Sequence, residues 1–345
     1  MKYYIIKREI NFCPICEDEH EVVLIKYVDE VKVKGEIIEC EVQAYYCEET
    51  QERFENGELV DENLQKIRDA YRIKHGLLTR KEIIEIRNKY GITQEELAII
   101  LGLGEKTIAR YESSIIQDKP YDVLIRKFND DYNFAYDMLI KSKEKINQRK
   151  FDQIRDTIID LIIKETPSLY NEIMLKNQYL KHDEESSVNG FTILNIPKIK
   201  SMLAYFARFT KNLFSVKLMK LLWYSDAVSF LRTGKAMSGL VYQHMPYGAL
   251  PKGFGEVECL DSVEREQMVY YDCLATQYFS KNKDMIDESL FTSEELDILH
   301  DVCVKFENIS GKELSEIMHQ EDAYKYTYDR EIIDFSIIKH LRAIQ

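Results

Sequence analysis

The 345-residue sequence lacks the features that define several protein classes. No apolar run approaches the roughly 18 residues that a membrane helix needs, and the first residues lack the apolar core of a signal peptide. The seven cysteines are odd in number and widely spread, which argues against a disulfide framework. Lys and Arg number 47 against 60 Asp and Glu, a net charge of −13, so bulk positive charge is missing as well. We therefore expect a cytoplasmic protein with no membrane partner.

The composition and the distribution of charge indicate several folded parts. Hydrophobic residues make up 45% of the chain and charged residues 31%, which is enough apolar material for cores in two or three domains. Residues 1–64 hold 7 basic and 17 acidic side chains, whereas residues 65–112 hold 10 basic and 7 acidic ones. A short basic stretch therefore follows a strongly acidic segment.

The acidic segment has the pattern of a small zinc-binding ribbon. Cys13 and Cys16 have the CxxC spacing that lets two thiolates bind one Zn²⁺ from a tight turn. Alternating runs at residues 21–27 and 37–46 predict two strands joined by a turn at residues 34–35. Cys47 follows the second strand, but Thr50 stands where a second CxxC pair would place its other cysteine.

The sequence therefore leaves the identity of a fourth zinc ligand undecided. Cys40 lies on the strand face opposite to Cys47, together with Val42 and Ala44, and we interpret it as a core residue. His20 could supply the ligand, although a lone histidine beside such a turn is more often an ordinary surface residue. Zinc is the cofactor that Cys13, Cys16 and Cys47 would hold.

The basic segment has the clearest motif, a helix-turn-helix over residues 91–112. Thr93 and Glu96 form a capping box that predicts a helix start at about residue 94. Gly102 suits the left-handed turn residue that ends this helix, and Ile108 falls where the second helix must bury an apolar side chain. Residues 64–72 and 79–90 predict helices that support the pair.

The exposed residues of this motif are the candidate DNA contacts. The second helix of such a pair enters the major groove with its N-terminal half, where Arg110 could read a guanine edge and Lys106 or Gln94 could hold phosphates. The alternative is that the helix pair serves only as a packing unit. The predicted DNA-binding residues are Gln94, Glu105, Lys106, Thr107 and Arg110.

These features together resemble the MqsA (YgiT-type) antitoxins over roughly residues 10–125. The residues that carry the resemblance are Cys13 and Cys16, the hairpin, the pair Tyr46-Cys47, and the helix-turn-helix closing on residues 110–112. The resemblance implies a zinc ribbon followed by an Xre-like DNA-binding domain. It also implies operator binding as a homodimer and repression of the protein's own promoter. Thr50 is a departure from the family pattern, which has a zinc-ligand cysteine there.

The C-terminal part predicts a mostly helical domain. Apolar spacing over residues 216–231 predicts a buried helix that ends at Gly234. Further helices are predicted at residues 262–278, at 293–307 with a cap from Thr292 and Glu295, and at 312–319 with a cap from Ser310 and Glu313. The polar residues 182–190 read as a linker before this domain.

This part is similar to the Panacea (SocA-like) antitoxin domain over roughly residues 190–335. The similarity is carried by residues 217–226, 233–235, 247–248 with Pro251, and 313–321. It implies a globular helical domain of antitoxins that are paired with many unrelated toxins. His244, His300 and His319 could form a metal or acid–base site, but no catalytic motif accompanies them, so we expect no enzyme.

The sequence therefore predicts a mainly α, α+β multidomain protein with four parts. These are a zinc-ribbon-like domain (1–62), an Xre-type helix-turn-helix domain (63–119), a helical connector (120–189) and a Panacea domain (190–345). The expected function is a type II antitoxin whose C-terminal domain binds and neutralises a cognate toxin protein and whose helix-turn-helix binds operator double-stranded DNA. A stand-alone Xre-family transcriptional regulator with a partner- or ligand-sensing C-terminal domain is the alternative.

Overall fold

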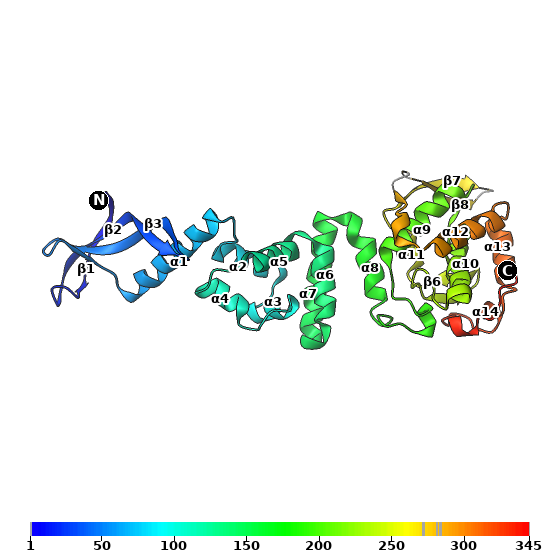
Figure 1. Cartoon of the computed structure of the whole chain (residues 1–345), viewed down its shortest axis with the longest axis horizontal. Helices are drawn as coiled ribbons and strands as arrows, with labels where there is room; N and C mark the ends of the chain where they lie inside the picture. The colour runs from blue at the N-terminus through cyan, green and yellow to red at the C-terminus, as the bar shows by residue number, and fades with distance from the viewer. Residues whose placement is uncertain (1, 271–272, 281, 283–284, 345) are drawn as a thin grey trace. The chain divides into compact units, whose positions relative to one another are not determined.

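The computed structural model describes residues 2–270, 273–280, 282 and 285–344 and contains two compact units, Met1–Glu165 and Thr166–Gln345. Figure 1 shows the helices and strands of each unit. The α+β fold class predicted from the sequence is confirmed. Within the described residues, no helix combines the length and the apolar character needed to cross a membrane.

The first unit begins with an antiparallel sheet in the order β1-β2-β3-β4 and continues with helices. The predicted hairpin is formed by β2 and β3, which pair from Val23 opposite Tyr46 to Val33 opposite Glu36. The unit consists of β1 (Tyr3–Cys13), β2 (Asp18–Val33), β3 (Glu36–Cys47), β4 (Glu52–Phe54), α1 (Gly57–Lys74), α2 (Arg80–Tyr90), α3 (Gln94–Ile100), α4 (Thr107–Ser113), α5 (Lys119–Asp130), α6 (Tyr132–Lys141), the 3-10 helix η1 (Lys143–Lys145) and α7 (Gln148–Glu165).

Each face of the sheet is covered by its own small hydrophobic core. On one face, Cys40 is buried beside Val42 and Ala44, and Ile67 and Ala70 of α1 pack against them. The interpretation of Cys40 as a core residue is therefore confirmed. On the other face, Cys13 and Cys47 are buried with Val22, Leu24 and Tyr45.

Helix α1 begins before the predicted boundary between residues 62 and 63 and crosses it. Asn56 caps its first turn, and the helix then runs for 18 residues to Lys74. The predicted helix at 79–90 is present as α2, with the expected capping box between Thr79 and Glu82. Helix α1 thus connects the ribbon-like sheet to the following helices without a break.

The second unit is built around α10, a central helix. Residues 217–229 of this helix are all buried, so α10 is enclosed on every side rather than amphipathic. The unit consists of the 3-10 helix η2 (Pro167–Leu169), α8 (Tyr170–Gln178), η3 (Ser187–Asn189), α9 (Ile196–Phe209), α10 (Ser215–Thr233), β5 (Tyr242–Met245), β6 (Gly248–Pro251), α11 (Phe254–Glu258), β7 (Val263–Tyr270), β8 (Cys273–Ser280), η5 (Glu288–Leu290), α12 (Ser293–Phe306), α13 (Gly311–Met318), α14 (Asp322–Lys325) and η6 (Phe335–Ile337).

Most of the predicted C-terminal helices are present, with one clear error. The capping boxes of α12 and α13 are formed as expected. The predicted helix at 262–278 is wrong, because the chain forms the antiparallel hairpin β7–β8 there. The segment contains Val263, Val269, Thr276 and three tyrosines, residue types that favour strands, and this preference outweighs the helical prediction.

The core of this unit also begins earlier than the linker predicted at 182–190. Leu175 of α8 and Tyr179 directly after it are buried in the same hydrophobic core as α9, α10 and α12. The Tyr179 hydroxyl donates to the carbonyl of Lys252 and accepts from the amide of Val241. The last helix of the predicted connector is therefore part of the C-terminal core.

One polar group on α10, the amine of Lys220, shows how the central helix meets its neighbours. Lys220 is fully buried, and its Nζ donates to the carbonyl of Ala249 at 2.8 Å. Gly248 lies against the same side chain, and a Cβ there would come within 2.8 Å of Lys220 Cε and 2.7 Å of Met318 Cγ. Burial lowers the pKa of Lys220 to about 7, because the charged form loses its hydration.

This buried lysine gives a prediction for the pH dependence of stability. The folded-state pKa lies below the unfolded value of about 10.4, so the unfolded chain binds more protons between about pH 7 and pH 10, and stability rises with pH there. Lys220→Met removes this titration. The quantity to compare is the thermal midpoint of the variant minus that of the parent protein. We expect this difference to be highest near pH 7 and to decline steadily towards pH 9.5. A difference that stays constant over this range would show that Lys220 does not titrate in the fold.

Candidate functional site

The helix pair predicted to bind DNA consists of two short helices, α3 and α4, joined at a glycine. The Thr93 hydroxyl accepts a hydrogen bond from the Glu96 amide, and the Glu96 carboxylate accepts one from the Thr93 amide at 2.7 Å. The predicted helix start at residue 94 is confirmed. Gly102 has a φ of 68°, the left-handed conformation expected at the end of α3. The fully buried side chains between the two helices include Leu97, Ala98 and Ile108.

Four of the five predicted DNA-binding residues surround the start of α4. Helix α4 begins at Thr107, so Glu105 and Lys106 lie in the turn that precedes it, and both are exposed. Arg110 is exposed one turn further along. Thr107 and Arg110 also line a groove of about 400 Å³ whose other wall includes Asp118 and Tyr121. An exposed guanidinium at the edge of a groove is free to meet a base edge or a phosphate.

The fifth predicted residue, Gln94, is part of a buried network. Its Nε2 donates to Oε2 of Glu112 at 2.7 Å. Arg87 binds the same carboxylate with two hydrogen bonds of 2.6 and 2.9 Å, and Glu112 is only 3% exposed. The Glu112 carboxylate raises the pKa of the Arg87 guanidinium. Spacing alone did not predict this network, since residues 87, 94 and 112 come from three different helices.

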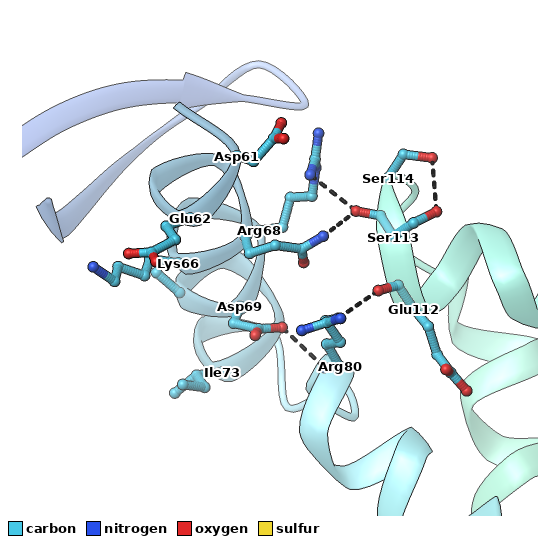
Figure 2. Close-up of a pocket in the computed structure, with 12 residues that line it drawn as sticks. Asp61, Glu62, Lys66, Arg68, Asp69, Ile73, Arg80, Glu112, Ser113 and Ser114 are labelled. Atoms are coloured by element: carbon cyan, nitrogen blue, oxygen red, sulfur yellow. Dashed lines mark hydrogen bonds between the residues drawn. The ribbon is translucent and has the colours of Figure 1, made fainter. Parts of the chain in front are cut away.

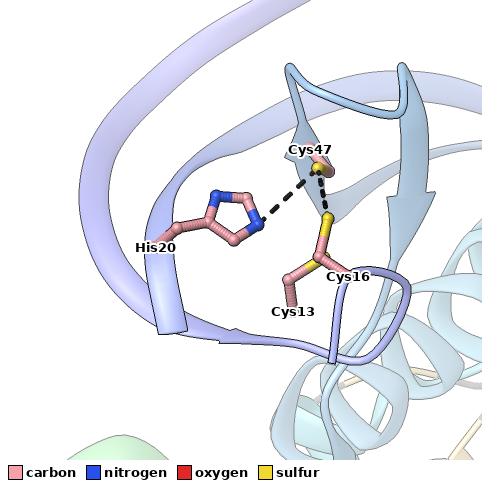
Figure 3. A group of neighbouring side chains, drawn as sticks. All are labelled: Cys13, Cys16, His20 and Cys47. Carbon is pink, nitrogen blue, oxygen red and sulfur yellow. Dashed lines mark hydrogen bonds between the residues drawn. The ribbon is translucent and has the colours of Figure 1, made fainter. Parts of the chain in front are cut away.

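The second candidate site is a cluster of three thiols and one imidazole at the end of the sheet. The ligand atoms of Cys13, Cys16, His20 and Cys47 all lie within 4.8 Å of one another (Figure 3). Cys16 Sγ lies 3.6 Å and His20 Nε2 lies 3.7 Å from Cys47 Sγ. The structure thus brings the three predicted cysteines together and places His20 in the fourth position.

The orientation of His20 fits a ligand. Its Nδ1 lies 3.0 Å from the carbonyl oxygen of Glu21, an acceptor, so this nitrogen carries the proton and Nε2 turns its lone pair to the thiols. Three sulfur atoms and one imidazole nitrogen form a donor set that Zn²⁺ binds in tetrahedral geometry. The group could therefore hold a metal ion, and its chemistry is compatible with zinc.

Thr50, which stands at the position of the missing cysteine, still contacts the cluster. Its hydrogen bonds, together with those of Cys16 and the Glu49 amide, lower the pKa of Cys47 to about 6 despite the burial of this thiol. Burial and the neighbouring thiols raise the pKa of Cys16 to about 12. Neighbouring thiols resist being deprotonated at the same time, because their negative charges repel one another. A bound divalent cation would supply the positive charge that allows all of them to ionise.

In the second unit, the residues that resemble the antitoxin domain mainly hold the fold together. Asp226 is fully buried and accepts hydrogen bonds from the amides of Met237 and Ser238 at 2.8 Å and from the Tyr242 hydroxyl at 2.6 Å. Burial raises the pKa of its carboxyl. Asp226 therefore fixes the chain after α10 onto the middle of that helix.

Glu321 performs the corresponding role for the C-terminal segment. It is fully buried and accepts from the Tyr224 hydroxyl at 3.2 Å and from the amides of Arg342 and Ala343 at 2.8 and 3.0 Å. The last residues are thus attached to α10 through one carboxylate.

The three histidines considered above as a metal or acid–base site lie in two separate places. His244 stacks on Tyr324 with ring centroids 3.6 Å apart, and His319 stacks on the same ring at 4.9 Å. His300 lines a separate groove with Arg342 and Ile344. Within the described part of the chain, these histidines belong to no cluster of three or more metal-ligating side chains.

The metal site gives a test of the fourth ligand. Purified protein should carry about one zinc ion per chain, and His20→Ala should lose this zinc to a chelator about tenfold faster or more, because one of four ligands is gone. Metal analysis and a chromogenic chelator measure both quantities. Cys40→Ala is the matched control and should keep its zinc, since Cys40 lies in the core of the opposite face. Equal zinc retention in His20→Ala would remove His20 from the ligand set.

One comparison with known families identifies part of the chain. Residues 218–325 match the family described as "Antitoxin SocA-like, Panacea domain". The match begins within α10 and ends with α14, so it includes Asp226, Gly248 and Glu321. No curated protein and no solved structure matches the chain. This part of the second unit is therefore similar to SocA-like antitoxin domains, which supports an antitoxin-type role at a coarse level.

Proposed function

We propose that this protein is the antitoxin of a type II toxin–antitoxin system and represses its own operon. The second unit binds a cognate toxin protein and blocks it by association, with no reaction catalysed. The first unit binds operator double-stranded DNA through α4, as a homodimer. Zinc in the cluster of Cys13, Cys16, His20 and Cys47 stabilises the sheet from which this unit begins.

The observation that carries the proposal is the SocA-like match over residues 218–325. The polar groups of that region support a binding role, because Asp226 and Glu321 are saturated with hydrogen bonds inside the fold. A buried carboxylate that already accepts several hydrogen bonds is poorly placed for acid–base chemistry on a substrate.

The DNA-binding part of the proposal is supported by the charge and exposure around α4. The first 64 residues carry ten more acidic than basic side chains, whereas the basic segment at 65–112 contains α4 and its exposed Lys106 and Arg110. Localised positive charge favours a short, specific contact with DNA over general coating. A twofold dimer would present two copies of α4 to two half-sites of a palindromic operator.

Co-expression with the product of the adjacent gene tests the antitoxin role. The neighbouring protein alone should arrest growth, and the full-length protein should restore growth and co-purify with it in a stable complex. A harmless neighbour, or a toxic one that forms no complex and is not neutralised, contradicts the proposal. Promoter repression without neutralisation would favour a stand-alone regulator.

Arg110→Ala tests the DNA-reading role separately. The change should weaken binding to the promoter by about 1–3 kcal/mol, the usual contribution of a side chain that reads a base edge. Gel-shift titration at fixed salt measures this, and neutralisation of the toxin should be unchanged. Arg330→Ala removes the same charge from an exposed position of the second unit and should leave DNA binding intact. If Arg110→Ala binds the promoter as tightly as the parent protein, Arg110 does not read the operator.

A further inference from the structure

The C-terminal end of α4 is held by side chains from outside the α3–α4 pair. Helix α4 has only seven residues and no side-chain cap at its start, so its own hydrogen bonds contribute little to its position. The carbonyl of Ser113 accepts from Gln65 and from Arg68, and the carbonyl of Glu112 accepts from Arg80 at 2.6 Å. Figure 2 shows these contacts around a pocket of about 910 Å³ between α1, α2 and α4.

The central member of this set is Arg72 of α1, whose side chain is fully buried. Its guanidinium donates to the carbonyls of Tyr111 at 2.5 Å and Ile115 at 2.9 Å, at the end of α4 and just beyond it. It also donates to the side chains of Gln117 at 3.0 Å and Asp69 at 2.8 Å. Carbonyls at a helix C-terminus lack partners within the helix and attract cations, so a buried guanidinium there fixes the helix strongly.

The opposite side of α1 lies on the sheet. Asn63 is 3% exposed, and its side chain pairs with the backbone of Gln43 in β3: Oδ1 accepts from the amide at 3.0 Å and Nδ2 donates to the carbonyl at 2.6 Å. Ile67 and Ala70 add apolar contacts with the core of the same face. One helix therefore contacts the sheet along one side and the end of α4 along the other.

We propose that Arg72 is a positioning residue for DNA recognition, and that α1 joins the sheet and α4 into one DNA-binding body. The inference rests on the proposed role of α4 in reading the operator. Arg72 cannot touch DNA itself, because no part of it is exposed. It acts by fixing the end of α4, and thereby the angle at which Arg110 reaches a base edge. A bidentate contact tolerates displacements of only about 0.5 Å.

This role differs measurably from that of a phosphate-binding cation. Loss of a phosphate contact weakens all DNA binding alike and reduces the salt dependence by about one ion. Loss of the position of α4 should weaken binding to the operator and leave binding to unrelated DNA and the salt dependence of that binding unchanged. The ratio of the two affinities is therefore the quantity to measure.

Arg72→Lys keeps the charge but removes the planar fork that makes these hydrogen bonds. In the full-length protein, we expect operator affinity to fall about tenfold while affinity for unrelated duplex stays the same. In the double variant with Arg110→Ala, the loss of operator affinity should be much smaller than the sum of the two single losses. Once α4 has moved, Arg110 no longer contacts its base properly, so its removal costs little more. A purely structural role would lower the thermal midpoint and give additive effects on operator binding.

Gln65→Ala supports the test with a milder change. Gln65 is neutral, so its removal takes away no ionic contact with a phosphate and should leave the salt dependence of binding unchanged. Its loss should lower the affinity ratio in the same direction by a smaller factor. Arg155→Lys is the matched control: Arg155 also binds carboxylates, those of Asp152 and Asp156, and these hydrogen bonds and ion pairs lie within α7. Its affinity ratio should equal that of the parent protein.

The affinity ratios and their additivity decide the inference. Unchanged affinity ratios in folded Arg72→Lys and Gln65→Ala overturn it, and so do additive effects with Arg110→Ala. If Arg72→Lys does not fold, Gln65→Ala alone decides. If the parent protein binds its promoter no better than unrelated DNA, the proposed operator binding fails and this inference fails with it. If it binds the promoter specifically but the variants match it, only the role of α1 is refuted.

Discussion

The first unit depends on the buried guanidinium of Arg72. Burying a cation is costly unless its N–H groups find acceptors, and here four contacts satisfy it: two backbone carbonyls, Asp69 and Gln117. Gln117 in turn donates to the carbonyl of Leu78 at 2.5 Å and to Asp122 at 3.0 Å. The end of α1, the segment before α2, the end of α4 and the start of α5 are therefore fixed by one polar network. None of them can shift without leaving a buried polar group unpaired.

The second unit uses the same principle with the opposite charge. Its central helix is enclosed on all sides, so the segments around it are fixed by carboxylates that accept backbone amides rather than by exposed ion pairs. Asp226 holds the chain that follows α10, and Glu321 holds the C-terminal residues. Hydrogen bonds between a buried carboxylate and backbone N–H groups are directional, so they determine position as well as stability.

What the sequence predicted well depended on local signals, and what it missed depended on distant ones. The capping boxes at Thr93, Thr292 and Ser310 involve residues three positions apart, and each marked a helix start correctly. Apart from the pair Arg72–Asp69, the contacts of Arg72 and Glu112 join residues 18 to 45 positions apart, and no spacing rule reaches that far. The β7–β8 hairpin was predicted as a helix, and its register joins residues up to 17 positions apart, from Val263 opposite Ser280 to Tyr270 opposite Cys273. The sequence alone could not assign His20 as a ligand, because its place beside Cys47 depends on the pairing of β1, β2 and β3.

A donor set of three thiols and one imidazole suits the charge of the segment around it better than four thiols would. Four thiolates around Zn²⁺ carry a net charge of −2, whereas three thiolates and a neutral imidazole carry −1. The first 64 residues hold 17 acidic side chains, and Glu49, Glu48 and Asp18 are neighbours of the cluster in sequence, so each further negative charge there is unfavourable. His20 would complete the donor set without adding charge, and the Thr50 hydrogen bonds lower the pKa of Cys47 and so favour its thiolate. Thr50 would thus keep a role beside the metal ligands, in agreement with the acidity of the first 64 residues.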